Sequence, residues 1–294
     1  MKKYSLGMYE KAVPKNLSWK EKIFEAKNAD YDFIEMSIDE TDEKLLRLEK
    51  SEKEIRAFVN LMSDENFFVR SICLSAHRKY PLGASDKKTE ARSLEILEKT
   101  VSLADRLGVR IVMLAGYDVY YEKSTDETRA RFEKNLQTCV ECASRAGVVL
   151  AFETMETPFM DTATKAKAYV DKIASPYLQI YPDLGNITNA AKIYEANAIS
   201  DLEKAKGHLV AAHIKETLPG KYREVPFGKG HVDFEGLLKK CWSLGVRRYV
   251  TELWHTGDDW KERLHEAVSF SRAILDACER DTGGNLQDAS ESAK

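Results

Sequence analysis

The sequence has few cysteines, few histidines and no long apolar run, and each shortage argues against a class of protein. Its five cysteines are odd in number and scattered along 294 residues, which argues against a disulfide framework and favours a reducing compartment. No segment approaches the roughly 18 apolar residues of a membrane helix, and the N-terminal segment has no signal-peptide core. We therefore expect a cytoplasmic protein without a membrane partner.

Net charge gives no indication of a polyanionic partner. The formal charge is −3, so the chain as a whole does not attract nucleic acid. Apolar residues make up 43% of the chain and charged residues 32%, which is the balance of a soluble globular protein. We therefore expect no nucleic-acid partner.

The one CxxC pattern, from Cys139 to Cys142, lies in a stretch with helical character at 129–145. Residues three apart share a helix face, so two small side chains can pack inward together. No second Cys or His pair lies nearby in the sequence. We interpret the pair as core packing, with a redox or metal function as the alternative.

A repeating pattern of helix, glycine and strand runs through the chain. Gly108, Gly147 and Gly245 each end an expected helix directly before an apolar strand. Strands that are apolar on both faces indicate a parallel sheet covered by helices. About eight such units predict a single (β/α)8 TIM barrel over residues 1–280, followed by a flexible tail at 281–294. A doubly wound open sheet is the alternative, but no GxGxxG turn follows the first expected strand.

Residue ranges for these elements follow from periodicity and capping residues. Strands are expected at 4–8, 31–37, 69–76, 111–114, 148–152, 178–182, 209–212 and 249–251. Helices are expected at 18–28, 54–62, 88–107, 129–145 and 260–278.

Four potential metal ligands stand where four successive strands end. They are Glu153, Asp183, His213 and Glu252. The active site of a TIM barrel lies at the carboxyl ends of its strands, so these side chains should converge. Three carboxylates and one imidazole suit one divalent ion, with Zn or Mn favoured and Co or Mg as alternatives. A single carboxylate at a strand end would more often cap a helix, but four in phase with the repeat predict a metal site.

The two glutamates suggest proton transfer. Placed across a metal from each other, Glu153 and Glu252 could face opposite sides of a ketose that binds through its carbonyl and adjacent hydroxyl. The ion would acidify the neighbouring C–H, one glutamate would take the proton, and the other would return one from the opposite face. The alternative is that both residues serve only as ligands.

Several longer segments resemble one family. They are GMYEKA at 7–12, MSIDETD at 36–42, SAHRKYPLG at 75–83, LAGYDVYY at 114–121, ETPFM at 156–160, YPDLGN at 181–186, HIKET at 213–217, VPFGKG at 225–230 and ELW at 252–254. On these motifs the chain resembles the L-ribulose-5-phosphate 3-epimerases (L-xylulose-5-phosphate 3-epimerases) of the xylose-isomerase-like barrel superfamily. The resemblance covers nearly all of residues 4–275.

This resemblance implies an isomerase that epimerises a ketopentose 5-phosphate at C3 through a metal-stabilised enediolate. It also implies metal ligation by the residues matching the family's ligand positions, with Glu153 and Glu252 as acid and base. Three positions depart from the family pattern: Glu156 and Glu216 stand where aspartate is usual, and Lys229 stands where glutamate is expected. We further expect a homodimer.

Binding of the substrate and its phosphate is expected at cations beyond the strand ends. Arg223 precedes a glycine-containing segment in the loop after the seventh strand, where barrels often hold phosphate. Lys215, His77 and Arg78 also follow strand ends, and any of these could pair with a dianion. Exposed cations without a ligand are the alternative. The aromatic segment 117–122 is expected to form a lid or subunit contact, or simply to pack.

Three other functions can be weighed against an epimerase. An aldose–ketose isomerase on the same barrel would use the same metal site. A DNA-repair endonuclease of a related barrel would need more histidine ligands and a basic groove, which six histidines and a charge of −3 do not favour. A sugar-binding barrel without catalysis would not need two opposed glutamates.

Overall fold

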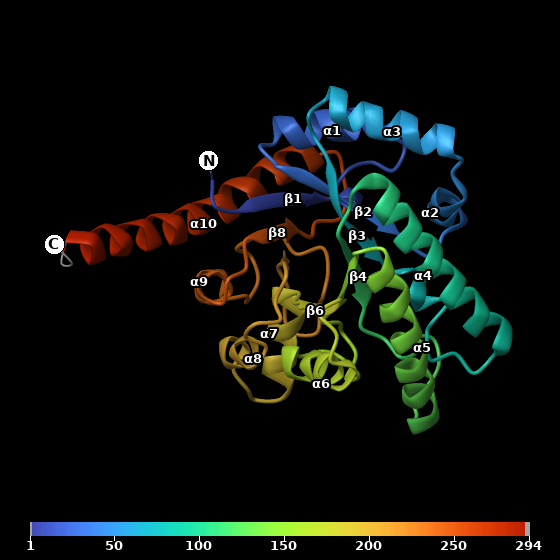
Figure 1. Cartoon of the computed structure of the whole chain (residues 1–294). Coiled ribbons are helices and arrows are strands. Elements are labelled where there is room, and N and C mark those ends of the chain that lie inside the picture. Colours follow the sequence, from blue (N-terminus) through green and yellow to red (C-terminus); the bar gives the residue numbers. More distant parts are fainter. Residues whose placement is uncertain (1, 292–294) are drawn as a thin grey trace.

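Eight parallel strands with helices around them form a barrel in the computed structural model, which describes residues 2–291 and the side chains of residues 2–282 (Figure 1). This confirms the predicted (β/α)8 architecture. The strands are β1 (Ser5–Tyr9), β2 (Phe33–Ile38), β3 (Val69–Leu74), β4 (Ile111–Ala115), β5 (Val149–Glu153), β6 (Leu178–Tyr181), β7 (Ala212–Ile214) and β8 (Arg248–Thr251).

Helices cover the outside of the barrel, and three short 3-10 turns accompany them. The α-helices are α1 (Trp19–Asn28), α2 (Asp42–Leu45), α3 (Glu52–Asp64), α4 (Lys87–Leu107), α5 (Asp126–Arg145), α6 (Ala163–Ile173), α7 (Leu184–Ile193), α8 (Ala198–Lys204), α9 (Phe234–Ser243) and α10 (Trp260–Glu291). The 3-10 turns are η1 (Glu10–Ala12), η2 (Leu46–Glu49) and η3 (Ala76–Arg78).

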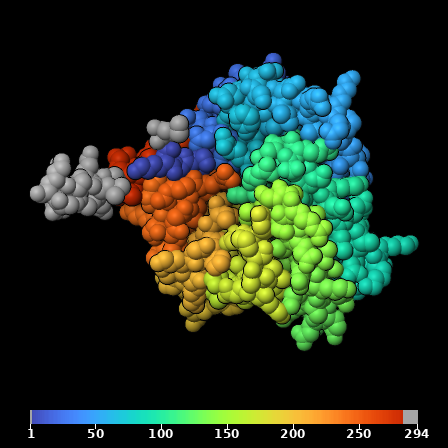
Figure 2. All heavy atoms as spheres, in the orientation of Figure 1, coloured from blue at the N-terminus to red at the C-terminus, as the bar shows by residue number. Residues whose placement is uncertain are grey.

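Hydrogen bonding runs around the barrel in the order β6-β5-β4-β3-β2-β1-β8-β7. The last junction, between β6 and β7, is made by two isolated parallel bridges, Ile180 with Leu209 and Asp183 with His213. In Figure 2 the sequence colours follow one another around the molecule, as expected when consecutive βα units lie side by side. The strand ends that carry the candidate ligands are therefore neighbours in space.

Local signals in the sequence explain where elements begin and end. Ser18 and Ser51 each form a capping box with the glutamate three residues later, which satisfies free N–H groups at the start of α1 and α3. Gly108 ends α4 at φ 72°, a left-handed conformation that glycine adopts without a steric penalty. The predicted glycine stop before β4 is confirmed.

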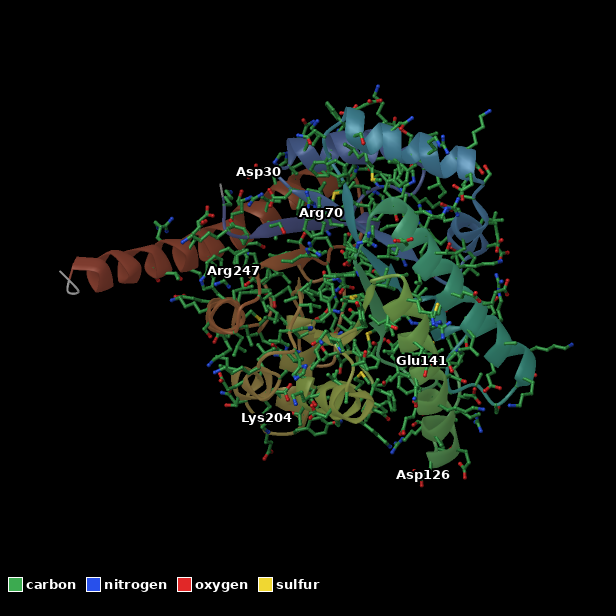
Figure 3. All side chains as sticks on the ribbon, viewed as in Figure 1. Asp30, Arg70, Asp126, Glu141, Lys204 and Arg247 are labelled. Carbon is green, nitrogen blue, oxygen red and sulfur yellow. The ribbon has the colours of Figure 1, made fainter. Side chains whose placement is uncertain are left out.

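The core has two layers. Outside the strands, apolar side chains pack between sheet and helices, as Phe132 of α5 does against Phe152 of β5. Inside the barrel a smaller cluster includes Tyr9, Phe33 and Tyr181. Charged side chains lie mainly on the outer rim, where Figure 3 labels Asp126, Glu141 and Lys204. Burial of these two apolar clusters therefore stabilises the barrel.

Several predicted boundaries differ from the structure, and two of the differences bear on the argument. Helix α10 does not end near Cys278 but continues to Glu291, so the predicted tail from Asp281 is largely helical, and residues 292–294 lie outside the described residues. Strand β7 begins at Ala212, so His213 lies within the strand rather than after it.

The remaining two expectations concern cysteine and the membrane. Cys139 is buried and Cys142 half-buried on α5, and both are free thiols, which fits core packing. Among the described residues no helix is long and apolar enough to cross a membrane.

Candidate metal centre and active site

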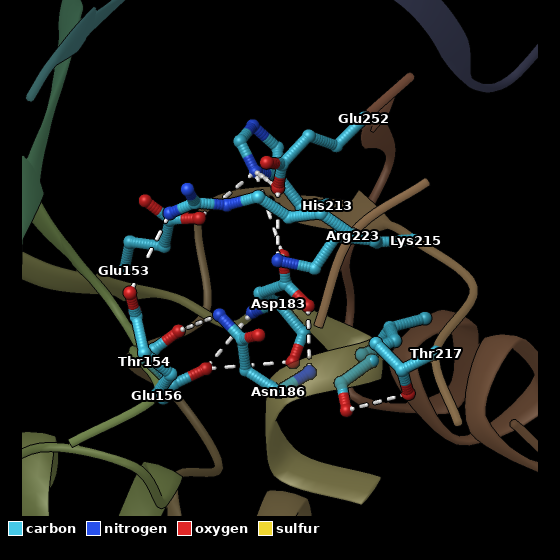
Figure 4. Close-up of polar contacts among 12 residues, drawn as sticks. Glu153, Thr154, Glu156, Asp183, Asn186, His213, Lys215, Thr217, Arg223 and Glu252 are labelled. Carbon is cyan, nitrogen blue, oxygen red and sulfur yellow. Dashed lines mark hydrogen bonds and ion pairs between the residues drawn. The ribbon is translucent and has the colours of Figure 1, made fainter. Parts of the chain in front are cut away.

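Four successive strands bring the four predicted ligands together (Figure 4). Glu153 is the last residue of β5, and Glu252 follows β8 directly. Asp183 follows β6 and is the N-cap of α7, where its Oδ1 accepts a hydrogen bond of 2.8 Å from the backbone N–H of Asn186. His213 is the middle residue of β7. All four side chains are buried, so the sequence prediction that they meet is supported by their placement.

Distances within the group suit a divalent ion. The ligand atoms offered by the four residues all lie within 4.8 Å of one another. Nδ1 of His213 is 3.3 Å from Oε1 of Glu153 and 3.1 Å from Oε2 of Glu252. Such a set of three carboxylates and an imidazole matches the preference of Mn, Zn, Co or Mg.

The far nitrogen of His213 has a partner that sequence reasoning missed. Nε2 lies 2.6 Å from Oε1 of Glu35, a buried carboxylate in the middle of β2. Because an ionised carboxylate only accepts hydrogen bonds, this contact places a proton on Nε2 and turns Nδ1 toward the other ligands. A glutamate between two apolar residues in the middle of a strand was the signal available in the sequence.

Lys215 places a positive charge among the ligands. Its Nζ is 2.6 Å from Oδ2 of Asp183 and 3.3 Å from Oε2 of Glu252. Burial alone would raise the pKa of Glu252, but the charges of Lys215 and His213 outweigh it and hold that pKa well below its usual range. Burial raises the pKa of Glu153, and Glu252 adds to that rise. The pKa values of the two glutamates are therefore shifted in opposite directions.

A cavity opens above the four ligands, and three of the four predicted substrate-binding residues line it: Arg78, Lys215 and Arg223. The guanidinium of Arg223 lies 3.5 Å from Oε1 of Glu156 and 5.1 Å from the ring centroid of Trp254. That of Arg78 lies 4.9 Å from the ring centroid of Tyr120.

His77, the fourth predicted residue, does not line this cavity. It is buried, with Nε2 3.1 Å from the backbone oxygen of Ser93 in α4. Burial lowers the pKa of His77 to about 4, which leaves the ring uncharged at neutral pH. The structure thus favours a packing function for His77 over phosphate binding.

The aromatic loop after β4 packs against Glu156. Tyr117 is buried and donates a hydrogen bond to Glu156, and the Tyr120 hydroxyl donates to the same carboxylate at 3.4 Å. Tyr121 is exposed and donates to Glu40 at 2.9 Å. Glu156, one of the three departures from the family pattern, lines the cavity and accepts the hydrogen bonds of Tyr117 and Tyr120.

Glu216, a second departure, ties down the loop that carries Arg223. Its buried carboxylate accepts from the backbone N–H groups of Thr217 at 3.0 Å, Gly228 at 3.0 Å and Val232 at 3.2 Å. A Cβ at Gly230 would lie only 2.2 Å from Oε1 of Glu216, so glycine is required there. Lys229, the third departure, is not among the residues that line the cavity.

A second group of cations lies after β1 and was not foreseen. Glu10 of η1 is 2.6 Å from Nζ of Lys22, 2.7 Å from Nζ of Lys44 and 2.6 Å from the guanidinium of Arg47. Three cations thus share one buried carboxylate. Burial lowers the pKa of Lys44, and although Glu10 raises it, the charge of Arg47 lowers it further. We call Glu10, Lys22, Lys44 and Arg47 the Glu10 cluster. All of its members except Arg47 line a cavity, together with Lys11, Lys15 and His255.

Fold and site together define a (β/α)8 barrel with a buried carboxylate–imidazole group at the carboxyl ends of β5 to β8. The chain belongs to the xylose isomerase-like TIM barrel family, whose model matches residues 23–274.

Named relatives are similar over almost the whole chain. The L-ribulose-5-phosphate 3-epimerase UlaE of Escherichia coli O157:H7 is 43% identical over 276 residues, covering 93% of this chain and 96% of that protein. The enzyme of the same name from Escherichia fergusonii is 42% identical with the same coverage. The protein is therefore an enzyme of the isomerase class.

Solved structures share the fold at lower identity. An L-ribulose 3-epimerase superposes with a TM-score of 0.76 at 20% identity, covering 95% of this chain and 97% of that one. D-allulose 3-epimerase from Methylomonas sp., in complex with D-allulose, gives 0.74 at 19% identity, covering 93% and 98%. A xylose isomerase-like barrel from Mycobacterium smegmatis in complex with magnesium gives 0.69 at 15%, covering 95% and 99%.

Proposed function

We propose that this enzyme catalyses divalent-metal-dependent 3-epimerisation of a ketopentose 5-phosphate, interconverting L-ribulose 5-phosphate and L-xylulose 5-phosphate. The relatives that are 43% identical carry the name of that activity. The observation that carries the proposal is the pair of buried glutamates on either side of Nδ1 of His213, at 3.3 Å for Glu153 and 3.1 Å for Glu252. They come from strands that two others separate in sequence order, so they approach a ligand in the cavity from different directions.

One divalent ion would be held by Glu153, Asp183, His213 and Glu252. The donor set favours Zn or Mn, with Co or Mg as alternatives. When bound, the ion would supply Lewis acidity, which makes the hydrogen at C3, next to the ketose carbonyl, easier to remove.

The proton transfers belong to the two glutamates. In one direction an ionised Glu252 accepts the C3 proton, and the electron pair of the broken C–H bond moves toward C2 to give an enediolate. A protonated Glu153 then donates to the opposite face of C3, which completes the inversion with no net gain or loss of atoms. The reverse reaction exchanges the two functions.

The phosphate of the substrate would bind a cation at the barrel mouth. Arg223 is our first choice, with Arg78 beside it, because both line the cavity above the ligands and arginine matches phosphate geometry. Lys215 is less suited because it already faces Asp183 and Glu252. The Glu10 cluster is the alternative, since it also has more cations than carboxylates.

The test is incubation of the purified protein with Zn or Mn and L-ribulose 5-phosphate in D2O. Deuterium at C3 of both epimers is expected. Label at C1 instead would indicate the aldose–ketose isomerase. Activity that is undiminished after removal of all divalent ions would contradict the metal-dependent scheme. Location in the cytoplasm and a homodimer stay predictions, which fractionation and sedimentation would check.

A further inference from the structure

Glu35 is a fully buried carboxylate in the barrel interior, beneath the four ligands. Its Oε2 accepts hydrogen bonds from Oγ of Ser71 at 2.7 Å and from the hydroxyl of Tyr181 at 3.0 Å. Its Oε1 is left for Nε2 of His213 at 2.6 Å. The exposed fraction of the Glu35, Ser71 and Tyr181 residues is 0%, so these contacts replace water entirely.

Packing alone does not account for a charge at this position. Among the described ion pairs, the only basic partner of Glu35 is His213. Burying a carboxylate without a lysine or arginine partner is unfavourable, because the charge loses its hydration. An uncharged side chain would fill the space without that cost. We therefore look for a function of the carboxylate group itself.

The contact fixes the orientation of the imidazole. Ser71 and Tyr181 come from β3 and β6, on either side of the barrel interior, and they hold the Glu35 carboxylate so that Oε1 faces His213. Nε2 then donates to Glu35, and Nδ1 is the nitrogen that faces Glu153 and Glu252. A carboxylate behind a ligating histidine orients the ring and strengthens its binding to the metal.

We propose that Glu35 is a positioning residue that presents Nδ1 of His213 to a divalent ion and raises the affinity of the site for it. This inference rests on the metal site of the proposed function. Glu35 touches neither the substrate cavity nor the other three ligands, and it acts through His213.

The test is the variant Glu35→Gln, which keeps the shape and removes the charge. Its dissociation constant for Zn alone, measured by competition with a chelating dye, should rise about 10- to 100-fold. Saturating Zn should restore most of kcat, because Glu35 does not touch the reacting atoms. An unchanged dissociation constant in a folded variant would overturn the proposal.

A matched control separates positioning from general loss of a buried carboxylate. Asp118 is buried after β4, where it accepts hydrogen bonds from Ser124 at 2.7 Å and Thr128 at 2.5 Å. Asp118→Asn should lower the unfolding temperature but leave the dissociation constant for Zn unchanged. An equal loss of Zn affinity in both variants would overturn the proposal.

Two further measurements keep the test decisive. If Glu35→Gln does not fold, Tyr181→Phe removes one donor and keeps the charge, and its Zn affinity should fall about threefold or more; no change would overturn the proposal. In Zn-loaded protein with 15N-labelled histidine, the Nε2–H proton of His213 should exchange slowly in the wild type and faster without Glu35. A wild type that binds no divalent ion would instead overturn the metal-dependent function, and this inference with it.

Discussion

The Nζ atom of Lys215 lies 2.6 Å from Oδ2 of Asp183, inside the group of residues that we propose as metal ligands. Both residues are buried, so water screens this attraction little. The ammonium therefore offsets part of the negative charge of three carboxylates that burial would otherwise protonate. Lys215 and a divalent ion would interact with the same carboxylates, so we expect Lys215 to act at the metal-binding end of the site rather than to bind the phosphate.

Glu153→Gln and Glu252→Gln should each abolish epimerisation. Glutamine has nearly the same shape as glutamate but cannot accept or donate the required proton. Loss of one positioned acid or base should lower kcat by about 100-fold or more. The measurement is deuterium incorporation at C3 in D2O together with metal content; near-normal turnover with metal bound would show that the residue is not an acid or base.

Asp183→Ala and His213→Ala should lose bound metal and activity together. Each substitution removes one of four ligands from the site. In the wild type, removal of divalent ions with a chelator should lower the unfolding temperature, because an ion that binds only the folded state stabilises it. Metal analysis by mass spectrometry checks both, and unchanged occupancy in the variants would contradict the ligand assignment.

Arg223→Ala should impair phosphate recognition more than the chemical step. Truncation removes a planar fork that matches phosphate oxygens. We expect KM for the ketopentose 5-phosphate to rise about tenfold or more, in keeping with the free energy of a charge-assisted hydrogen bond. The unphosphorylated ketose should be affected little, and kcat/KM for both sugars is the measurement.

Lys44→Gln is the matched variant for the Glu10 cluster, because Lys22 and Arg47 still pair with Glu10 when Lys44 is neutral. If the phosphate binds at Arg223, Lys44→Gln should not change the ratio of kcat/KM for the ketopentose 5-phosphate to kcat/KM for the unphosphorylated ketose. If Lys44→Gln gives the phosphate-selective loss and Arg223→Ala does not, the phosphate binds beside the Glu10 cluster and our first choice is wrong.

His77→Gln should change the pH dependence of stability and not the substrate KM. The folded-state pKa of His77 is about 4, below its ordinary 6.5, so between these pH values the unfolded chain binds a proton that the folded protein does not. Stability linked to His77 is therefore present above pH 6.5 and lost as pH falls toward 4, by about 3 kcal/mol. Urea unfolding at pH 7 and pH 5 should show a smaller difference in the variant. An increased KM would restore His77 as a substrate residue.

Sequence reasoning located the ends of β5 and β8 well, because each apolar run there stops at a polar residue, Glu153 or Glu252. It placed the end of β7 too early, because His213 lies within that strand. It also located the end of α4, where Gly108 adopts a left-handed backbone conformation, but not the end of α10. Contacts between distant segments carried no comparable signal. Glu35 and His213 are 178 positions apart, and only the closure of the barrel brings them to 2.6 Å.

Side-chain direction explains the other differences. His77 and Arg78 are adjacent in η3, but one packs against α4 and the other lines the cavity. Periodicity cannot assign faces in a turn of three residues. The three cations around Glu10 of η1 come from α1, α2 and η2, so no short sequence window contains the group.

The junction between β6 and β7 has only two isolated bridges among the described residues, and the four proposed ligands lie on both sides of it. Glu153 and Asp183 lie on one side of it, and His213 and Glu252 lie on the other, while the backbone itself supplies two isolated bridges. An ion bound by all four residues would link the two sides of the junction between β6 and β7. Without it, amide protons of β6 and β7 should exchange with solvent sooner than those of β2 to β4, because local opening needs only the few contacts there to break. One ion would then set both the acidity of a sugar C–H bond and the lifetime of the closed barrel.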